Sequence, residues 1–417
     1  MRKRRKMYKS KKLETICPRA DHPDKDPYGS HLMPVYQTST FAFPDADSGR
    51  KFFAHEEGGA THSYSRLGNP TVEKLEETLA VMEAANLSTK AESMVFSSGM
   101  AAITTAFMAI APGKTLIAQE TLYGCTSQFL TEEASKFGID VIQIDSNDPD
   151  KFIEAIEKAD NPGLLFFESI ANPTLTVFDM EPVVRKAHDR NIVVMVDNTF
   201  ATPWHIQPFK WDCDIVAHST TKYINGHGSV IGGALVMKEG IRAEYNLDMY
   251  RKNHGGTASP FDAWLTLLGL KTFPLRMRKH SENASIVAEY LDNHDSVGEV
   301  FYPGLASNRD HHLAKKYMAN GYGGMISFEL KGGYEAGKSL MNHVKLCTLA
   351  VSLGNVDTLI QHPASMTHAV MSREARERTG ITDGLVRISS GTEAIEDIIM
   401  DLEQALAYIP ENHVSLE

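Results

Sequence analysis

The sequence predicts an α/β fold, a mostly parallel sheet covered by helices, followed by a smaller C-terminal α+β domain. Between residues 70 and 270, short apolar runs alternate with helix-length segments, which is the pattern of βαβ units. The chain of 417 residues also exceeds what one hydrophobic core usually supports. Since ligands of parallel sheets bind at the carboxyl ends of the strands, we expect the functional residues there.

Composition narrows the class of protein. The net charge of −11 disfavours nucleic acid as a partner, because phosphate binding needs a basic surface. The four cysteines form no C-x-x-C pair, which argues against a zinc site or a disulfide framework and favours the cytoplasm. The longest apolar stretch, residues 101–111, is too short to span a membrane. We therefore expect no metal, no nucleic acid and no membrane partner.

The chain begins with two segments outside this pattern. Residues 1–12 are basic and lack the apolar stretch of a signal peptide, so we interpret them as a disordered tail. Residues 13–69 are rich in turn formers and aromatics without a sustained helical period, which predicts an irregular arm packed on a neighbouring subunit. Pro70, after Asn69, suits the first position of a helix, whose apolar face would comprise Val72, Leu75, Leu79 and Met82.

The elements that follow are expected in alternation. The apolar runs that predict strands are Ser93–Phe96, Thr115–Ala118, Val141–Ile144, Leu164–Glu168, Ile192–Asp197, Ile215–His218 and Ala234–Met237. The intervening helical segments are Met100–Ala111, Thr126–Phe137, Lys151–Lys158 and Met180–Asp189. Ser259-Pro260 looks like a further helix start. The second domain is expected to contain strands at Met325–Leu330, Lys345–Leu349 and Val386–Ser389 and a last helix around Ile395–Leu406.

Lys222 is the first candidate for chemistry. It follows the run Ile215–His218 and is flanked by the hydroxyl side chains of Ser219 and Thr221. Partial desolvation at the end of a buried strand lowers the pKa of an amine, which suits a nucleophile that forms a Schiff base. For a single lysine considered alone, an ordinary solvated side chain at a strand end is the commoner case.

Two other strand ends supply complementary groups. Residues 97–100, Ser-Ser-Gly-Met, follow a strand and open a helix, so backbone N–H groups there can bind a phosphate. Asp197 ends an apolar strand and can face a protonated ring nitrogen. Taken alone, the first feature is more often a plain turn, and a helix cap or loop carboxylate explains Asp197 at least as well. Combined with Lys222, they match the phosphate, ring nitrogen and aldehyde of pyridoxal phosphate.

The stretch Ala217–His227, AHSTTKYINGH, resembles the cofactor-lysine motif of the Cys/Met-metabolism family of fold-type I pyridoxal-phosphate enzymes. The similarity extends from YSRLGNPT at residues 64–71 to VRIS at residues 386–389. The resemblance implies the fold-type I transferase architecture and pyridoxal 5'-phosphate as cofactor. It also implies a cofactor-binding domain at residues 70–270 and a C-terminal domain at residues 271–417.

The resemblance further implies the cofactor contacts. Lys222 would bind the cofactor covalently and then move protons between substrate carbons. The remaining contacts would be Asp197 at the ring nitrogen, Asn172 near the ring hydroxyl, Tyr123 stacked on the ring, and Gly99, Met100, Ser219 and Thr221 at the phosphate. Tyr64 and Arg66 match a pair that reaches the phosphate of the neighbouring subunit. A homodimer with shared active sites is therefore expected, and the family implies that dimers pair into a homotetramer.

Five positions bear on the substrate. Tyr123 matches the general acid to the leaving group, Arg387 the clamp on the substrate carboxylate and Ser352 a residue that places substrate and lysine. Cys125, after Tyr123-Gly124, resembles the methionine γ-lyase branch of the family. The apolar Val351 stands where the cystathionine enzymes generally carry a glutamate, and it suits a methylthio end. Arg251-Lys252 departs from that branch, which has a Lys-Asp pair there near the entrance to the site.

The resemblance thus implies a carbon–sulfur lyase that performs α,γ-elimination of L-methionine to methanethiol, 2-oxobutanoate and ammonia. Two other activities of the same family stay open, γ-replacement as in O-acetylhomoserine sulfhydrylases and cystathionine γ-lysis. A non-catalytic binding module with the same fold is a third alternative, against which Lys222, Asp197, Tyr123 and Arg387 argue together.

Overall fold

The computed structural model describes residues 12–409 except residues 24–25, 145–146, 370–371 and 379. Residues 1–11 of the expected basic tail lie outside this part of the chain. None of the helices in the described ranges is long and apolar enough to cross a bilayer.

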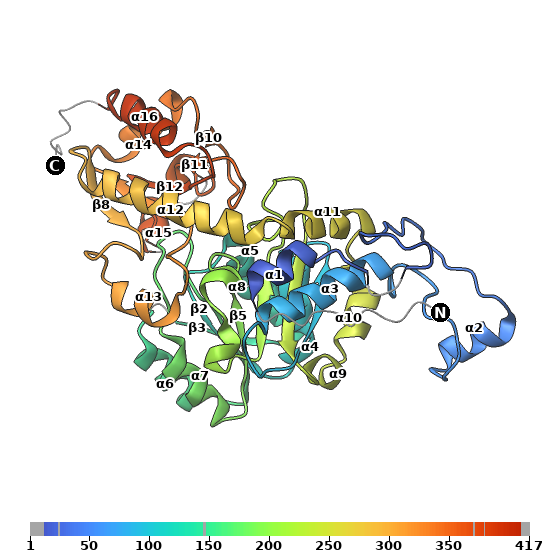
Figure 1. Ribbon diagram of the computed structural model, residues 1–417. Coiled ribbons are helices and arrows are strands. Elements are labelled where there is room, and N and C mark those ends of the chain that lie inside the picture. Colours follow the sequence, from blue (N-terminus) through green and yellow to red (C-terminus); the bar gives the residue numbers. More distant parts are fainter. Residues whose placement is uncertain (1–11, 24–25, 145–146, 370–371, 379, 410–417) are drawn as a thin grey trace.

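A seven-stranded sheet forms the centre of the larger part of the molecule (Figure 1). Its strands lie in the order β1-β7-β6-β5-β4-β2-β3, and only β7 runs against the others. All seven expected strands are present, with ends that differ by up to two residues, and the mostly parallel sheet is confirmed. The strands are β1 Ala91–Phe96, β2 Thr115–Gln119, β3 Asp140–Ile144, β4 Pro162–Glu168, β5 Val193–Asp197, β6 Ile215–His218 and β7 Gly233–Lys238.

Both faces of this sheet are covered because its strands are apolar on both sides. In β4, Leu164 and Phe166 join the core under α4 and α10, whereas Leu165 and Phe167 join the core under α3, α6, α7 and α11. The helices of this part are α3 Pro70–Glu83, α4 Gly99–Ile110, α5 Gly124–Gln128, α6 Pro149–Lys158, α7 Met180–His188, α8 Thr202–His205, α9 Ile241–Glu244, α10 Leu247–His254 and α11 Pro260–Leu270, with short turns at Phe129–Glu133, Ala134–Phe137 and Pro208–Trp211.

Two expected helix starts are confirmed by their caps. The side chain of Asn69 accepts a hydrogen bond from the Thr71 N–H at 3.0 Å, and Pro70 occupies the first helical position of α3. Ser259 caps α11 in the same way before Pro260. The helix expected over Thr126–Phe137 is instead broken into α5 and two irregular turns.

The C-terminal part is built on a second sheet, connected to the first by the 20-residue helix α12, Phe273–Asp292 (Figure 1). Its strands lie in the order β10-β11-β12-β9-β8 and are largely antiparallel. The strands are β8 Val297–Phe301, β9 Met325–Leu330, β10 Thr348–Leu349, β11 Leu359–Gln361 and β12 Leu385–Ser389. The helices are α13 His311–Tyr317, α14 Gly333–His343, α15 Arg373–Arg378 and α16 Ile395–Leu406, with a turn at Pro363–Ser365.

The strand expected over Lys345–Leu349 is shorter than its sequence predicts. Only β10 remains, because the N–H groups of Lys345, Leu346 and Cys347 donate to the carboxylate of Asp401 at 2.7–2.9 Å and are unavailable to a neighbouring strand. The strands β8 and β11 had no counterpart among the expected elements.

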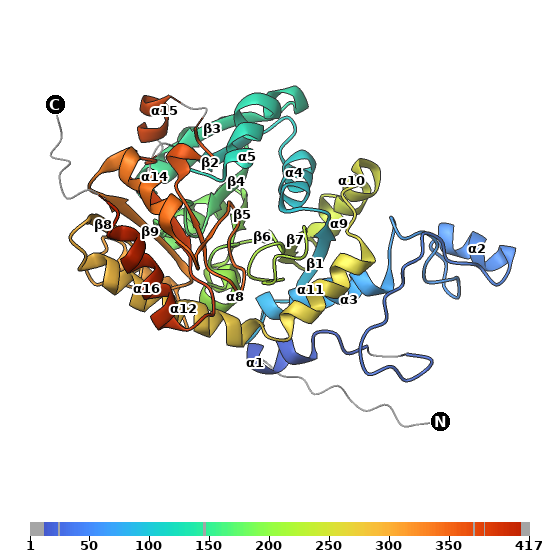
Figure 2. The ribbon, with the colours of Figure 1, turned by 90° about the horizontal axis from the view of Figure 1, so that it is seen from above.

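The N-terminal segment has two distinct halves. Three residues at its start are buried in this chain's own core. They are Leu13 in α1 Leu13–Ile16, Cys17 in the turn Cys17–Arg19, and Ala20 directly after that turn. Further along, α2 Ala46–Phe53 stands apart from the body of the molecule in both ribbon views (Figures 1 and 2). This helix was not expected from the irregular sequence, and Asp45 caps it through the Ser48 N–H at 2.7 Å.

Candidate active site

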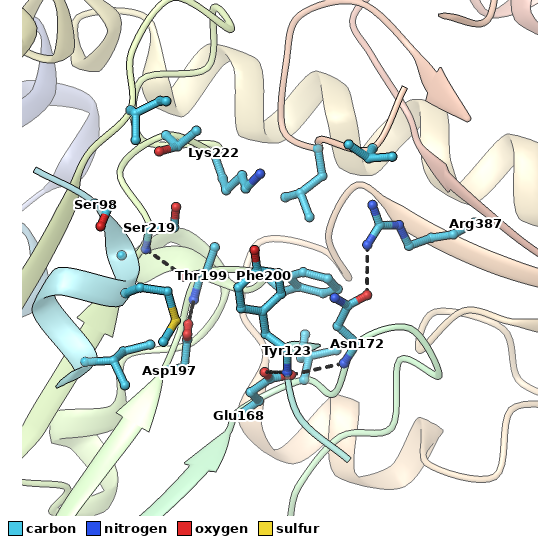
Figure 3. A pocket seen from close by; sticks show the side chains of 18 residues that line it. Ser98, Tyr123, Glu168, Asn172, Asp197, Thr199, Phe200, Ser219, Lys222 and Arg387 are labelled. Atoms are coloured by element: carbon cyan, nitrogen blue, oxygen red, sulfur yellow. Dashed lines mark hydrogen bonds between the residues drawn. The ribbon is translucent and has the colours of Figure 1, made fainter. Parts of the chain in front are cut away.

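A cavity of about 290 Å³ lies at the carboxyl ends of β1, β4, β5 and β6, where the C-terminal part closes over them (Figure 3). The cavity therefore lies at the strand ends, where the sequence predicts the functional residues. The lining residues are Ser98, Gly99, Met100, Ile103, Tyr123, Glu168, Ile170, Asn172, Asp197, Thr199, Phe200, Ser219, Thr221, Lys222, Ile231, Val351, Leu353 and Arg387.

Lys222 enters this cavity from the turn that follows β6 (Figure 3). Its Nζ donates a hydrogen bond to the Ser352 hydroxyl at 3.0 Å, so the amine is oriented by the C-terminal part. Burial, and secondarily the charge of Arg387, lowers the pKa of Lys222 to about 8. A substantial share of the amine is therefore neutral and nucleophilic at slightly alkaline pH.

The turn between β1 and α4 brings backbone N–H groups to the cavity. Ser98 caps α4 by accepting from the Ala101 N–H at 3.0 Å, which leaves the N–H groups of Gly99 and Met100 in the first turn of the helix. Ser219 packs against Gly99 so closely that a Cβ there would lie 3.1 Å from the Ser219 Cβ. The Thr221 hydroxyl instead bonds the backbone of Gly232, accepting from its N–H at 2.9 Å.

Asp197 ends β5 and is paired in register with Glu168 at the end of β4. The Asp197 carboxylate accepts a hydrogen bond from the Thr199 N–H at 2.9 Å. Burial raises the pKa of Asp197, opposed by Thr199 and by the charge of His218. Asp197, which is partly buried, and the buried Glu168 are neighbouring acidic side chains, and they favour a cationic group of a ligand, as a protonated ring nitrogen would provide.

Tyr123 follows β2 and lies between this cavity and a second one. Its side chain is 48% exposed, and its hydroxyl lies 3.6 Å from the Cys125 sulfur. The hydrogen bond with Cys125, with burial as the next cause, raises the pKa of Tyr123 to about 12. The phenol therefore stays protonated at neutral pH. Cys125 itself lines the second cavity and not the first.

Arg387, on β12, points into the cavity from the side opposite Asp197 (Figure 3). Its guanidinium donates to the Asn172 side-chain oxygen at 2.8 Å and to the Ser352 carbonyl at 3.2 Å. Burial lowers the pKa of Arg387 to about 10, so the side chain remains a cation at neutral pH. It is suited to bind a carboxylate in a buried site.

The second cavity, of about 650 Å³, shares Tyr123, Asn172, Val351 and Arg387 with the first. It is large enough for the distal part of an amino acid held at Arg387. Val351 is 59% exposed and lines both cavities.

The structure does not bring every expected residue to the cavity of its own chain. Tyr64 and Arg66 line neither cavity, and the Arg66 guanidinium lies 5.6 Å from the centre of the Tyr64 ring and donates to the Lys252 carbonyl at 2.6 Å. Arg251 is 7% exposed and forms an ion pair with Glu76 in the interior. Arg251, which together with Lys252 replaces the Lys-Asp pair of the methionine γ-lyase branch, therefore lies in the core of this chain.

Several lining residues were not singled out from the sequence. Glu168 carried the same signal as Asp197, a carboxylate at the end of an apolar run. Thr199, whose hydroxyl accepts from the Ser219 N–H at 2.9 Å, and Phe200 follow Asp197 directly in the chain. Their position directly after a strand was the only local feature of the sequence that indicated a place in the site.

The mostly parallel sheet and the groups at its strand ends fit the class of pyridoxal-phosphate-dependent enzymes. Lys222 offers an amine of lowered pKa, and Asp197 offers a carboxyl group at the end of β5. Gly99, packed closely on Ser219, offers backbone N–H groups at a helix N-terminus. Residues 14–407 match the family model of Cys/Met metabolism PLP-dependent enzymes, and the chain belongs to this family.

Similar proteins of known name span nearly the whole chain. An L-methionine gamma-lyase of Fusobacterium nucleatum subsp. polymorphum is 46% identical over 387 residues, 92% of this chain and 95% of that protein. An L-methionine gamma-lyase of Pseudomonas putida is 40% identical and covers 96% of this chain and 99% of its own length. The crystal structure of cystathionine gamma synthase from Xanthomonas oryzae pv. oryzae in complex with aminoacrylate and cysteine matches with a TM-score of 0.87 at 38% identity, over 95% of this chain and 98% of that chain.

Proposed function

We propose that this enzyme is a carbon–sulfur lyase that converts L-methionine and water to methanethiol, 2-oxobutanoate and ammonia. The observation that carries the proposal is one cavity in which an amine of lowered pKa, a protonated phenol and a buried guanidinium converge, at Lys222, Tyr123 and Arg387. The names of the relatives from Fusobacterium and Pseudomonas support the same reaction.

In this proposal Lys222 is the base. The bound cofactor supplies an aldehyde for the covalent link to an amine and a ring that accepts electron pairs. The Lys222 Nζ would take the proton from the α-carbon of the substrate and carry protons between the α- and β-carbons. Its hydrogen bond to Ser352 keeps it on the substrate side of the cavity.

Tyr123 is the acid. Its raised pKa keeps the proton on the hydroxyl at neutral pH, so Tyr123 can give that proton to the sulfur of the departing methanethiolate. Cys125, at 3.6 Å, orients the hydroxyl and supports its raised pKa.

Arg387 binds the substrate carboxylate, and Asn172 and Ser352 hold the guanidinium in place. The reacting carbons are thereby directed towards Lys222. Val351 presents an apolar surface to the methylthio end, where a charged residue would favour a longer substrate with a distal ammonium.

The cofactor would be held from both sides. We assign Asp197 to the ring nitrogen, Asn172 to the ring hydroxyl, and the Gly99 and Met100 N–H groups with Ser219 and Thr221 to the phosphate. Since Tyr64 and Arg66 lie outside the cavity of their own chain, we assign them to the phosphate of the neighbouring subunit. The working unit is then a homodimer, and we propose that two dimers form a tetramer.

The remaining assignments follow from the same comparison. We propose residues 70–270 as the cofactor-binding domain and 271–417 as the C-terminal domain, with residues 13–69 as an arm whose later half contacts the neighbouring subunit. We place the enzyme in the cytoplasm, which the four free cysteines support.

The second candidate function is action on cystathionine or O-acetylhomoserine. The similarity to a cystathionine gamma synthase and the cavity beyond Tyr123, larger than a methylthio group needs, favour it as an alternative.

Product analysis with methionine, cystathionine and O-acetylhomoserine, supplied separately at equal concentration, tests the proposal. We expect 2-oxobutanoate and methanethiol from methionine alone, without an added thiol. Formation of product only when O-acetylhomoserine and a thiol are both present would assign γ-replacement instead. The Lys222→Ala variant serves as the control for cofactor-dependent turnover.

A further inference from the structure

Glu168 is a buried carboxylate at the centre of the site for which the reaction above requires no role. It ends β4, is 6% exposed and lines the cavity. Its backbone N–H donates to the Gln119 side-chain oxygen at 2.8 Å, which anchors it to β2. The position of the carboxylate is therefore fixed by two strands of the sheet.

The two oxygens of this carboxylate accept hydrogen bonds from two different loops (Figure 3). Oε1 accepts from the Tyr123 N–H at 2.7 Å, and Oε2 accepts from the Asn172 N–H at 3.1 Å. Both donors are backbone groups, so the contacts position the loops and leave the side chains of Tyr123 and Asn172 available to the cavity.

These contacts connect opposite sides of the site. The side-chain oxygen of Asn172 accepts from the Arg387 guanidinium at 2.8 Å. A continuous path of hydrogen bonds thus runs from the Tyr123 backbone through Glu168 and Asn172 to Arg387. The first residue of this path carries the assigned acid and the last carries the assigned carboxylate clamp.

We propose that Glu168 is a positioning residue that sets the placement of the Tyr123 hydroxyl relative to the Arg387 guanidinium, and thereby places the leaving group of the substrate against its proton donor. This inference rests on the roles proposed for Tyr123 and Arg387.

Burial of a carboxylate beside a second acidic side chain is energetically unfavourable, so its presence at position 168 argues for a role beyond packing. Burial and the neighbouring Asp197 raise the pKa of Glu168, while the two backbone N–H groups oppose that change because they bind the ionised form with both of its oxygens as acceptors. An apolar side chain would avoid this cost, but it could not accept two hydrogen bonds at once. Glutamine could accept only one and would face the other N–H with its own N–H₂ group.

Steady-state kinetics of Glu168→Gln on the holoenzyme test the inference. We expect kcat for methionine to fall by about 100-fold, because the acid is misplaced, and KM to rise by about tenfold, because the clamp is no longer held. A merely structural role would lower the active fraction, and so kcat, without raising KM. The matched control is Glu299→Gln, an exposed glutamate on β8 of the C-terminal part, which should leave both constants within twofold.

A double-mutant cycle distinguishes positioning of Tyr123 by Glu168 from two independent losses of activity. Tyr123→Phe keeps the backbone N–H but lacks the hydroxyl, so in that background Glu168→Gln should cost little further in kcat. If the two losses in kcat multiply fully, or if KM of Glu168→Gln stays within twofold of wild type, the inference is wrong.

A measurement on the wild-type holoenzyme covers the case in which Glu168→Gln does not fold. The amides of Tyr123 and Asn172 should exchange with solvent at least about tenfold more slowly than unbonded loop amides, and exchange at unbonded rates would overturn the inference. This outcome is independent of substrate, whereas failure of the proposed function would appear as wild-type enzyme that releases no 2-oxobutanoate from methionine.

Discussion

The sulfur of Cys125 lies 3.6 Å from the hydroxyl oxygen of Tyr123, and this contact is the largest cause of the raised pKa of the phenol. Both residues belong to one short segment, so the chain itself sets their separation. A phenol with a pKa of about 12 keeps its proton over the whole range in which the enzyme is expected to work. We therefore expect the Cys125 thiol to influence the reaction through the pKa of Tyr123.

Replacement of Cys125 by alanine should shift the alkaline limb of the kcat profile to lower pH. Without its partner, the pKa of Tyr123 falls towards the ordinary value for tyrosine, about 10, and the acid is deprotonated earlier as pH rises. The measurement is kcat for methionine between neutral pH and the alkaline limit of stability. Ser135→Ala, an exposed change in the turn Ala134–Phe137, is the control, and an alkaline limb that coincides in both variants would contradict the prediction.

The amine of Lys222 should react with the cofactor in a pH-dependent manner. Because its pKa is about 8, the rate at which the apoenzyme takes up pyridoxal phosphate should rise with pH and level off above that value, where the amine is neutral.

Burial is the larger cause of the lowered pKa of Lys222 and Arg387 the next, so Arg387→Gln should move the midpoint of this profile upward but keep it below that of a free lysine. Stopped-flow absorbance measures the rate, with Arg278→Gln on the exposed side of α12 as control. Identical midpoints in the two variants would refute the assigned cause.

The turn that we assign to the phosphate depends on close backbone packing at Gly233. A Cβ at this position would lie 2.1 Å from the Ser98 carbonyl oxygen and 2.6 Å from the Gly99 nitrogen. Gly233→Ala should therefore displace the turn, weaken cofactor binding by more than about tenfold and destabilise the protein by about 1–3 kcal/mol. Equilibrium titration with pyridoxal phosphate and thermal unfolding test both effects.

Gly298→Ala is the matched control, since a Cβ there makes only ordinary van der Waals contacts, with the Glu329 carbonyl oxygen at 3.7 Å and the Lys331 Cγ at 3.8 Å. It should leave cofactor affinity unchanged. Equal affinities in Gly233→Ala and Gly298→Ala would mean that the turn does not hold the phosphate.

The sequence allowed the strand-end groups to be predicted because local pattern determines them. Asp197 and Lys222 each terminate or follow an apolar run, and the parallel sheet brings such ends to one edge. Glu168 met the same criterion, and no further local feature distinguishes it. Its importance depends on the loops that approach it, which arise from chain segments 45 and 4 residues away.

Pairs that form across the molecule could not be derived in this way. Asn172 and Arg387 are separated by 215 residues, and only the family resemblance indicated both. The same limit applies to β10, which is shortened by Asp401 at a separation of 54–56 residues, and to β11, whose three residues are too few to show a period. Such features depend on tertiary contacts that no window of the sequence contains.

Complementation between inactive subunits tests the shared active site. Arg66→Ala should weaken cofactor binding in the neighbouring subunit, and Lys222→Ala should abolish turnover in its own. A mixed dimer contains one site with both native residues, and half of randomly paired dimers are mixed, so an equal mixture should recover about a quarter of wild-type activity. Mixing Lys222→Ala with the Arg66→Ala, Lys222→Ala double variant provides a control without recovery. If mixed dimers form but stay inactive, Arg66 does not serve the neighbouring site.

Val351 should decide between methionine and substrates with a charged distal group. The side chain is 59% exposed and lines both cavities, so glutamate at this position fits without disturbing the core. Its carboxylate would meet the distal ammonium of cystathionine and would place a charge beside the methylthio group of methionine. We expect kcat/KM to rise about tenfold for cystathionine and to fall about tenfold for methionine in Val351→Glu.

The control Leu349→Glu adds the same charge on β10, outside both cavities, and should leave the ratio of the two constants unchanged. An unchanged ratio in Val351→Glu as well would show that the distal group of the substrate lies elsewhere.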